Sequence, residues 1–127
     1  MALIKLRDSI LPHDYTAKAL LDGDVYGRDG QKIGTVKDLY VDSEEVDVRF
    51  LDVGAGGFLG LGEKHFMIPV EAVTDTSGDG VTIEHSRQKV EGSPVLDTKG
   101  VPEDAYQHEV YDYYGYLNSR SHYPGGA

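Results

Sequence analysis

Residues 28–42 read RDGQKIGTVKDLYVD, and this stretch decides the fold class of the 127-residue chain. Asp29 and Gly30 signal a turn, because glycine adopts positive φ without a Cβ clash and aspartate tolerates that region better than most residues. From Asp38 onward the apolar residues recur with a spacing close to two, as expected of a strand with one buried face. Gly34 interrupts the pattern and predicts a bulge or sharp bend where this strand curls.

A second run, VDVRFLDV, follows a predicted hairpin tip at residues 43–45. Its apolar and charged residues alternate, so Val46, Val48 and Phe50 are expected to point to one face and the charged residues to the other. The two runs together predict a hairpin.

Two further strands complete the pattern. The run at 64–70 contains Pro69, which has no N–H to donate and is therefore expected at a strand end or on a sheet edge. The turn signal at 77–80 leads to a short closing strand at 81–83. Short strands joined by Gly/Asp turns predict a mainly β fold, a small barrel of antiparallel strands. The residues expected to be buried in it are Ile33, Val36, Val48, Phe50, Phe66 and Ile68.

A helix is expected near the C-terminus. Pro102 suits a first helical turn, and Tyr106, Val110, Tyr113 and Tyr114 then fall on one helical face. This face docks either on the barrel of its own chain or on a neighbour, and the sequence leaves both open.

The flanking segments divide the chain further. A strand is expected near residues 3–6, a helical turn or an extended arm at 15–21, and a short helix at 84–91 capped by Ser86. The predicted organisation is an N-terminal arm at 1–21, a barrel domain at 22–94, a linker and C-terminal helix at 95–116, and a disordered tail at 117–127.

The chain is acidic, with 22 Asp and Glu residues against 12 Lys and Arg residues and a net charge of −10. Nucleic acids and anionic lipids bind chiefly through Lys and Arg, so neither is expected as a partner. The acidic surface could bind a basic protein partner, or its charge could serve solubility alone. No stretch approaches the roughly 20 apolar residues of a membrane helix, so no membrane insertion is expected. The N-terminus lacks a signal-peptide pattern, which predicts a cytoplasmic location.

The glycine-rich stretch GAGGFLGLG at 54–62 does not fit a dinucleotide loop. The Gly-x-Gly-x-x-Gly pattern needs glycine where Leu59 stands, and a helix where the sequence predicts a strand. Phe58, Leu59 and Leu61 are three large apolar residues in a loop. They either fold back over the mouth of the barrel or bury against another chain.

No arrangement for catalysis or metal binding is found in the sequence. No two of the five histidines have the i, i+4 spacing of a helical metal site, and there is no cysteine. The acidic stretch that starts at Asp42 lacks the glycine and glutamate of a calcium loop at the sixth and twelfth positions, which are Asp47 and Val53. We therefore predict no catalytic residues, no cofactor and no metal, and a protein that is not an enzyme.

Three segments in order, GDVYGRDGQKIGTVKDLYVD, VRFLDVGAGGFLGLGEKHFMIPVEAV and VTIEHSRQKVEGSPV, resemble the PRC-barrel domain. The resemblance runs from about residue 22 to 94. The family includes the cytoplasmic domain of the photosynthetic reaction centre H subunit and one domain of a bacterial factor for maturation of small-subunit ribosomal RNA. It implies a small PRC-type β-barrel that binds or assembles other proteins, with no shared catalytic residues.

The leading hypothesis is a soluble, non-enzymatic interaction module that self-associates as a homodimer and could also bind another protein. Alternatives by resemblance are an accessory to ribosomal RNA maturation and an accessory of a photosynthetic electron-transfer complex. The candidate interface residues are Phe58, Leu59, Leu61, Tyr106, Val110, Tyr113 and Tyr114.

Overall fold

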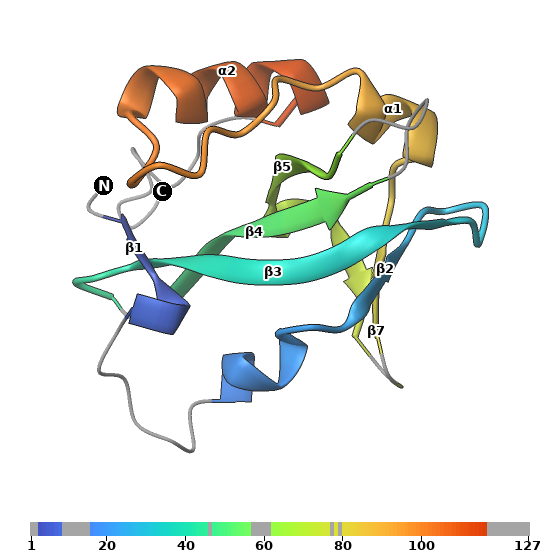
Figure 1. Cartoon of the computed structure of the whole chain (residues 1–127), viewed down its shortest axis with the longest axis horizontal. Coiled ribbons are helices and arrows are strands. Elements are labelled where there is room, and N and C mark those ends of the chain that lie inside the picture. The colour runs from blue at the N-terminus through green and yellow to red at the C-terminus, as the bar shows by residue number, and fades with distance from the viewer. Residues whose placement is uncertain are drawn as a thin grey trace.

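Seven short strands form one curled sheet, and a helix near the C-terminus covers part of its outer face (Figure 1). The structure is a computed structural model. It describes residues 3–8, 16–45, 47–56, 62–76, 78 and 80–116. The strands are β1 (Leu3–Lys5), β2 (Asp24–Tyr26), β3 (Lys32–Asp42), β4 (Asp47–Ala55), β5 (Lys64–Pro69), β6 (Val73–Asp75) and β7 (Gly80–Ile83). The helices are η1 (Leu6–Asp8), η2 (Thr16–Leu20), η4 (Val70–Ala72), α1 (Arg87–Glu91) and α2 (Asp104–Tyr114).

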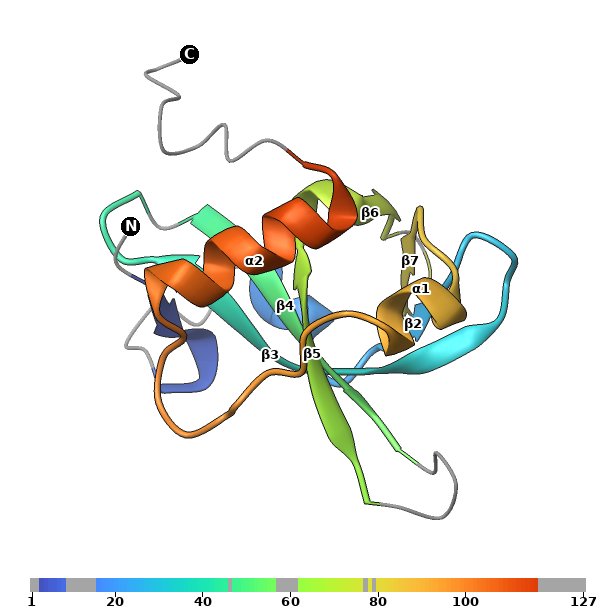
Figure 2. The same ribbon diagram turned by 90° about the horizontal axis from the view of Figure 1, so that it is seen from above.

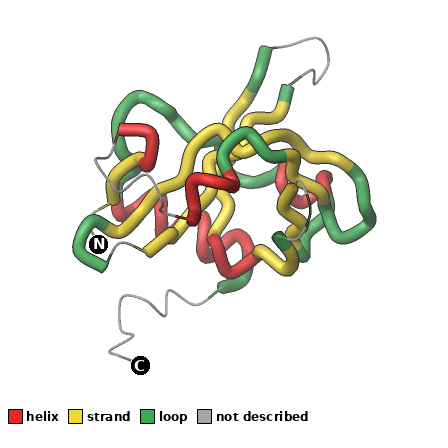
Figure 3. Tube along the Cα trace, turned by 90° about the horizontal axis from the view of Figure 1, so that it is seen from below, coloured by secondary structure: helices red, strands yellow, loops and turns green. Residues whose placement is uncertain are grey.

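The strand order is β5-β4-β3-β2-β7-β6, and β1 pairs with the far end of β3. The strands curve around the interior, as the view from below shows (Figure 3). The mainly β fold class, with a small PRC-type barrel sheet and a short C-terminal helix, is confirmed. One pairing differs from the expected antiparallel pattern, because β2 and β7 run parallel.

A bulge at Arg49 changes which side chains share a face. Tyr40 pairs with Phe50, but Val41 pairs with Val48, so Arg49 is an extra residue in β4. An extra residue shifts the alternation by one position. Val48 therefore packs against the interior cluster, whereas Phe50 lies in the cluster beneath α2. The prediction that Val48 and Phe50 share a face is wrong for this reason.

The core has two parts, one on each face of the sheet. The interior cluster contains the buried apolar residues of the concave face, among them Ile33, Val36, Leu51, Val53, Phe66 and Ile68. The second cluster joins the outer face to α2 and contains Leu3, Tyr40, Phe50, Met67, Leu96, Val110, Tyr111 and Tyr114. Five of the six residues predicted to be buried are buried, and Val48 is half-buried.

Gly34 lies where β3 and β4 come closest. A Cβ atom on Gly34 would stand 2.2 Å from the carbonyl oxygen of Gly54, which is far inside van der Waals contact. The register between β2 and β3 also shifts beside this glycine, since Val25 pairs with Gly34 and Tyr26 with Lys32. The irregularity predicted at Gly34 is confirmed.

Several local predictions are confirmed, and one is shifted. Residues 3–5 form an added strand, Pro69 ends the edge strand β5, and the Ser86 side chain caps α1 by accepting from the Lys89 N–H. Helix α2 begins at Asp104, and Glu103 occupies the N-cap position, so Pro102 precedes the first turn and does not lie in it. In the part of the chain that the structure describes, none of the helices combines the length and the apolar content needed to cross a membrane.

Candidate interaction surface

An extended segment, residues 94–103, connects α1 to α2 and is called the strap here. It passes along the edge strand β5 before it reaches the start of α2 (Figure 2). Val95 forms a bridge with Phe66, and the Leu96 N–H donates to the His65 carbonyl at 2.8 Å. At the far end, the Lys5 ammonium donates to the Thr98 carbonyl at 2.8 Å. Bonds from β1 and β5 thus hold the strap against the sheet.

A groove of about 420 Å³ lies between the strap and the first turn of α2. Its lining includes two valines, and these are the exposed large apolar residues of the described chain. Val95 is 52% exposed and Val101 is 46% exposed. The residues that line the groove are Val95, Leu96, Asp97, Lys99, Val101, Pro102, Glu103 and Tyr106.

Tyr106 forms the wall of the groove on the helix side. Its hydroxyl donates to the Pro94 carbonyl at 2.9 Å, and the next residue, Gln107, donates from Nε2 to the Pro102 carbonyl at 3.1 Å. Burial raises the pKa of Tyr106 above its usual range, with smaller contributions from nearby acidic groups such as Glu109. These two bonds fix both ends of the strap to α2, so the groove is bounded by anchored walls.

Beside the strap, a polar pair of buried Asp52 and half-buried His65 joins β4 to β5. His65 Nδ1 lies 2.6 Å from a carboxylate oxygen of Asp52, which is only 5% exposed. Burial raises the pKa of Asp52, and the hydrogen bond and charge of His65 offset part of that rise. Burial, together with the charges of Asp52 and Asp38, raises the pKa of Tyr40 well above its usual range. The Asp52–His65 pair resembles a base and its orienting group, and its hydrogen bond ties two strands together.

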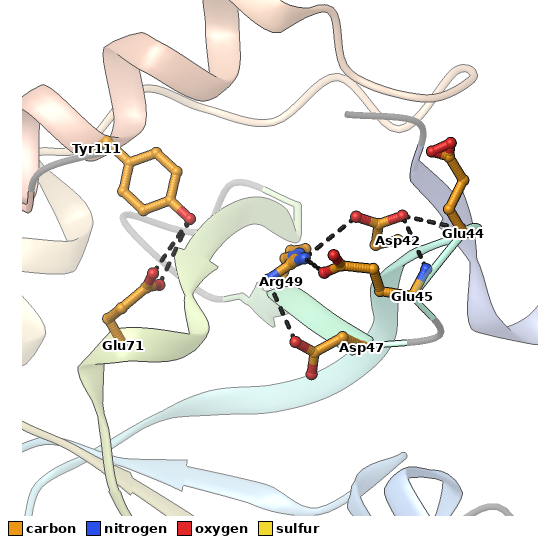
Figure 4. A network of polar contacts seen from close by, with 7 residues as sticks. All are labelled: Asp42, Glu44, Glu45, Asp47, Arg49, Glu71 and Tyr111. Atoms are coloured by element: carbon orange, nitrogen blue, oxygen red, sulfur yellow. Dashed lines mark hydrogen bonds and ion pairs between the residues drawn. The ribbon is translucent and has the colours of Figure 1, made fainter. Parts of the chain in front are cut away.

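A second charged cluster occupies the hairpin tip between β3 and β4 (Figure 4). Arg49 is 3% exposed, and its guanidinium binds Asp42 at 3.1 Å, Glu45 at 2.5 Å and Asp47 at 3.2 Å. Burial alone would raise the pKa of Asp42. The Glu44 N–H and the Arg49 guanidinium outweigh it, and the pKa lies below its ordinary value. The cluster buries the bulged residue of β4 with its charge compensated, so its role is to hold the hairpin.

A third polar cluster fixes the end of α2. His85 Nε2 lies 2.8 Å from the hydroxyl of Tyr116, which also bonds Glu84. The His85 ring packs against Tyr114 with centroids 4.8 Å apart. Burial lowers the pKa of His85, and the nearby charge of Glu84 acts in the opposite direction. Helix α2 ends at Gly115, whose φ of +80° suits glycine.

The structure separates the predicted interface residues into three groups. Phe58, Leu59 and Leu61 lie outside the described residues. Val110 and Tyr114 are buried against the sheet of the same chain. The remaining two residues of the predicted helical face, Tyr106 and Tyr113, are partly exposed.

These two tyrosines differ in what they contact. Tyr106 lines the groove, whereas the Tyr113 hydroxyl donates to the Lys89 carbonyl at 2.7 Å and joins α2 to α1. The sequence predicts a linker and a helix at 95–116, and this prediction does not include Val95 and Val101 among the interface residues. Two valines within a short polar stretch were the available signal.

Comparison with known families identifies the domain family to which the sheet belongs. A family model for the PRC-barrel domain matches residues 12–90, which is more than half of the chain. The chain belongs to the PRC-barrel domain family. A search among curated proteins gave no match. The PRC-barrel match covers β2 to β7 and most of α1 but ends before the strap, so the groove is formed by residues that follow the matched region. Across the described residues, no group of three or more His, Asp or Glu side chains is arranged to hold a metal ion.

Proposed function

We propose that this PRC-barrel protein is a soluble, non-enzymatic interaction module of the cytoplasm, and that the groove between the strap and α2 is its binding surface. The observation that carries the proposal is the exposure of Val95 and Val101 in one groove. Covering a large aliphatic side chain that is fully exposed gains about 1.5–3 kcal/mol, so two half-exposed valines offer a partner a real fraction of that gain.

The use of the titratable groups also favours binding over catalysis. His65 and Asp52 tie β4 to β5, and His85 packs within an aromatic cluster that holds α2. Each of these groups makes contacts that position secondary structure. The groove itself offers a tyrosine hydroxyl already bonded to a carbonyl, together with exposed charged side chains. Such a lining suits recognition of a side chain better than a chemical step.

Self-association is a second candidate, favoured by the glycine-rich stretch of the sequence. Phe58, Leu59 and Leu61 put three large apolar side chains among five glycines. In a two-fold dimer such a segment meets its own copy, so each apolar residue contributes twice. This hypothesis concerns a different part of the chain from the groove, and the two candidates can be tested separately.

Photo-crosslinking tests the proposed surface. A benzophenone amino acid replaces Val101 in the groove and, in a control protein, Asp8 of η1, which lies on the other side of β3 from α2 in Figure 1. Both proteins are expressed in the native cells and irradiated. We expect a discrete protein adduct from position 101 and none of that mass from position 8. An adduct pattern that is the same at both positions, or no adduct at position 101, would contradict the proposal. An adduct of twice the chain mass would instead place a second copy in the groove.

A further inference from the structure

The charges around the groove are unbalanced. Residues 95–112, which form the strap and most of α2, carry five acidic side chains and one basic side chain, a net charge of −4 with histidine neutral. The acidic residues are Asp97, Glu103, Asp104, Glu109 and Asp112, and all five are exposed. This segment is about one seventh of the chain but carries four tenths of the net charge of −10.

The four acids at the start and along the outer face of α2 lack counter-ions. Within the described residues, Glu103, Asp104, Glu109 and Asp112 make no salt bridge. Acids elsewhere are commonly paired, as Asp24 is with Lys32. The charged residues that line the groove are Asp97, Lys99 and Glu103, and the other three acids lie on the adjoining helix α2. The groove thus combines two exposed valines with a net negative charge in and beside it, which is called the rim here.

Building on the proposed function, we infer that the groove receives a basic segment of another protein, which inserts an aliphatic side chain between Val95 and Val101 and places Lys or Arg against the acids of α2. The apolar contact supplies the stable part of the complex, since buried aliphatic anchors control dissociation. The rim charges speed encounter and select against acidic partners. The partner is therefore defined by an aliphatic side chain and by basic residues beside it.

Charge also disfavours the other occupants. A phosphate backbone or an anionic lipid surface would meet a rim of its own sign. A second copy of this chain carries a net charge of −10, so docking it against the acidic rim brings like charges together. A basic protein segment is the occupant for which the aliphatic contact and the charge act in the same direction.

Three labelled peptides test this inference on the full-length protein. The first alternates Lys or Arg with Leu or Val, the second replaces the basic residues with Glu, and the third keeps the basic residues and replaces the aliphatic ones with Ser. Fluorescence anisotropy is measured at about 50 mM and 300 mM salt. We expect the first peptide to bind at least about tenfold more tightly than the other two. Its affinity should fall at the higher salt concentration.

Variants then locate the binding site. Val101→Thr keeps the shape of the side chain and removes its apolar character, and Glu103→Lys reverses a rim charge. Each substitution should lower the affinity for the first peptide by about fivefold or more, a change of the size expected for interface residues. Asp8→Lys, the same charge reversal on η1, should leave the affinity unchanged.

Each outcome decides the inference. Equal binding of the acidic and basic aliphatic peptides, both weakened by Val101→Thr, would overturn the charge argument and leave the groove as a protein-binding surface. Binding of the basic peptide that neither groove variant changes would place it elsewhere and overturn the inference. No binding of the basic peptide at about 1 mM, the range of the weakest specific complexes, would also overturn it. The crosslink at position 101 tests the proposed function independently of all these results.

Discussion

Replacing Phe50 with alanine should lower the free energy of unfolding by about 3–5 kcal/mol. The Phe50 ring is fully buried beneath α2, and its centroid lies 5.3 Å from that of Tyr111. Strand β4 is paired on both sides, with β3 and with β5, so the backbone cannot move in to fill the cavity. A domain of this size has a total stability of about 5–15 kcal/mol. At about 4 °C per kcal/mol, the Tm should fall by about 12–20 °C.

The assay is urea and thermal unfolding followed by circular dichroism, carried out as a double-mutant cycle. Phe50→Ala and Tyr111→Ala together should cost about 0.5–1.5 kcal/mol less than the sum of the two single changes, because each substitution alone already removes the contact between the two rings. Tyr113→Ala, which truncates a tyrosine of α2 that contacts α1, should be additive with Phe50→Ala within about 0.5 kcal/mol. A Phe50→Ala protein within about 1 kcal/mol of wild type would refute the reasoning, because Phe50 would then not support α2.

Gly34→Ala should destabilise the protein by about 1–3 kcal/mol in urea unfolding, since its Cβ would collide with the carbonyl of the facing strand, whereas Gly56→Ala, with ordinary contact distances, should change the stability little. If the two substitutions cost the same, β3 and β4 do not approach closely at Gly34. The pKa of His85 is lowered in the folded state, so its contribution to stability is complete above its ordinary pKa of about 6.5 and is lost as the pH falls from there. His85→Phe should therefore make the decline in unfolding free energy between about pH 7 and pH 5 shallower, and an unchanged slope would argue against a buried neutral imidazole. Phe58→Asp combined with Leu61→Asp should give a folded monomer by size exclusion with light scattering and circular dichroism. A wild-type mass that the double variant leaves unchanged would exclude the loop as the dimer interface.

Local signals in the sequence were sufficient for most of the sheet. The Asp29-Gly30 turn, the strand end at Pro69 and the cap at Ser86 each depend on the chemistry of a few adjacent residues. The helical spacing that begins at Tyr106 included two of the α2 residues that are buried against the sheet, Val110 and Tyr114, but not Tyr111. These features were predictable because each is fixed by a short stretch of sequence.

The bulge at Arg49 could not be predicted from the alternation. A bulge adds one residue to one strand and leaves the composition of that strand unchanged. The sequence pattern placed Arg49 on the face opposite Val48 and Phe50. In the structure three acids neutralise it, and it is nearly fully buried. Only the pairing with β3 reveals the shift, and that pairing is a property of two strands together.

The groove was missed because its walls are brought together by long-range bonds. Leu96 reaches His65, and Thr98 reaches Lys5, across more than 30 and 90 residues of sequence respectively. The sequence predicts a linker and a helix at 95–116, because the residues before the helix contain no periodic pattern. Val95 and Val101 gain their significance only when β1 and β5 hold the strap beside α2.

The most direct test of the account is a nuclear magnetic resonance titration of the ¹⁵N-labelled protein with the basic aliphatic peptide. The central claim is that the surface between the strap and α2 receives a protein segment. We predict that the largest changes in amide chemical shift fall between Val95 and Glu109. These changes should saturate with added peptide, and higher salt should raise the peptide concentration needed for saturation. Changes concentrated at the hairpin tip near Gly30, or spread evenly over the sheet, would contradict the claim.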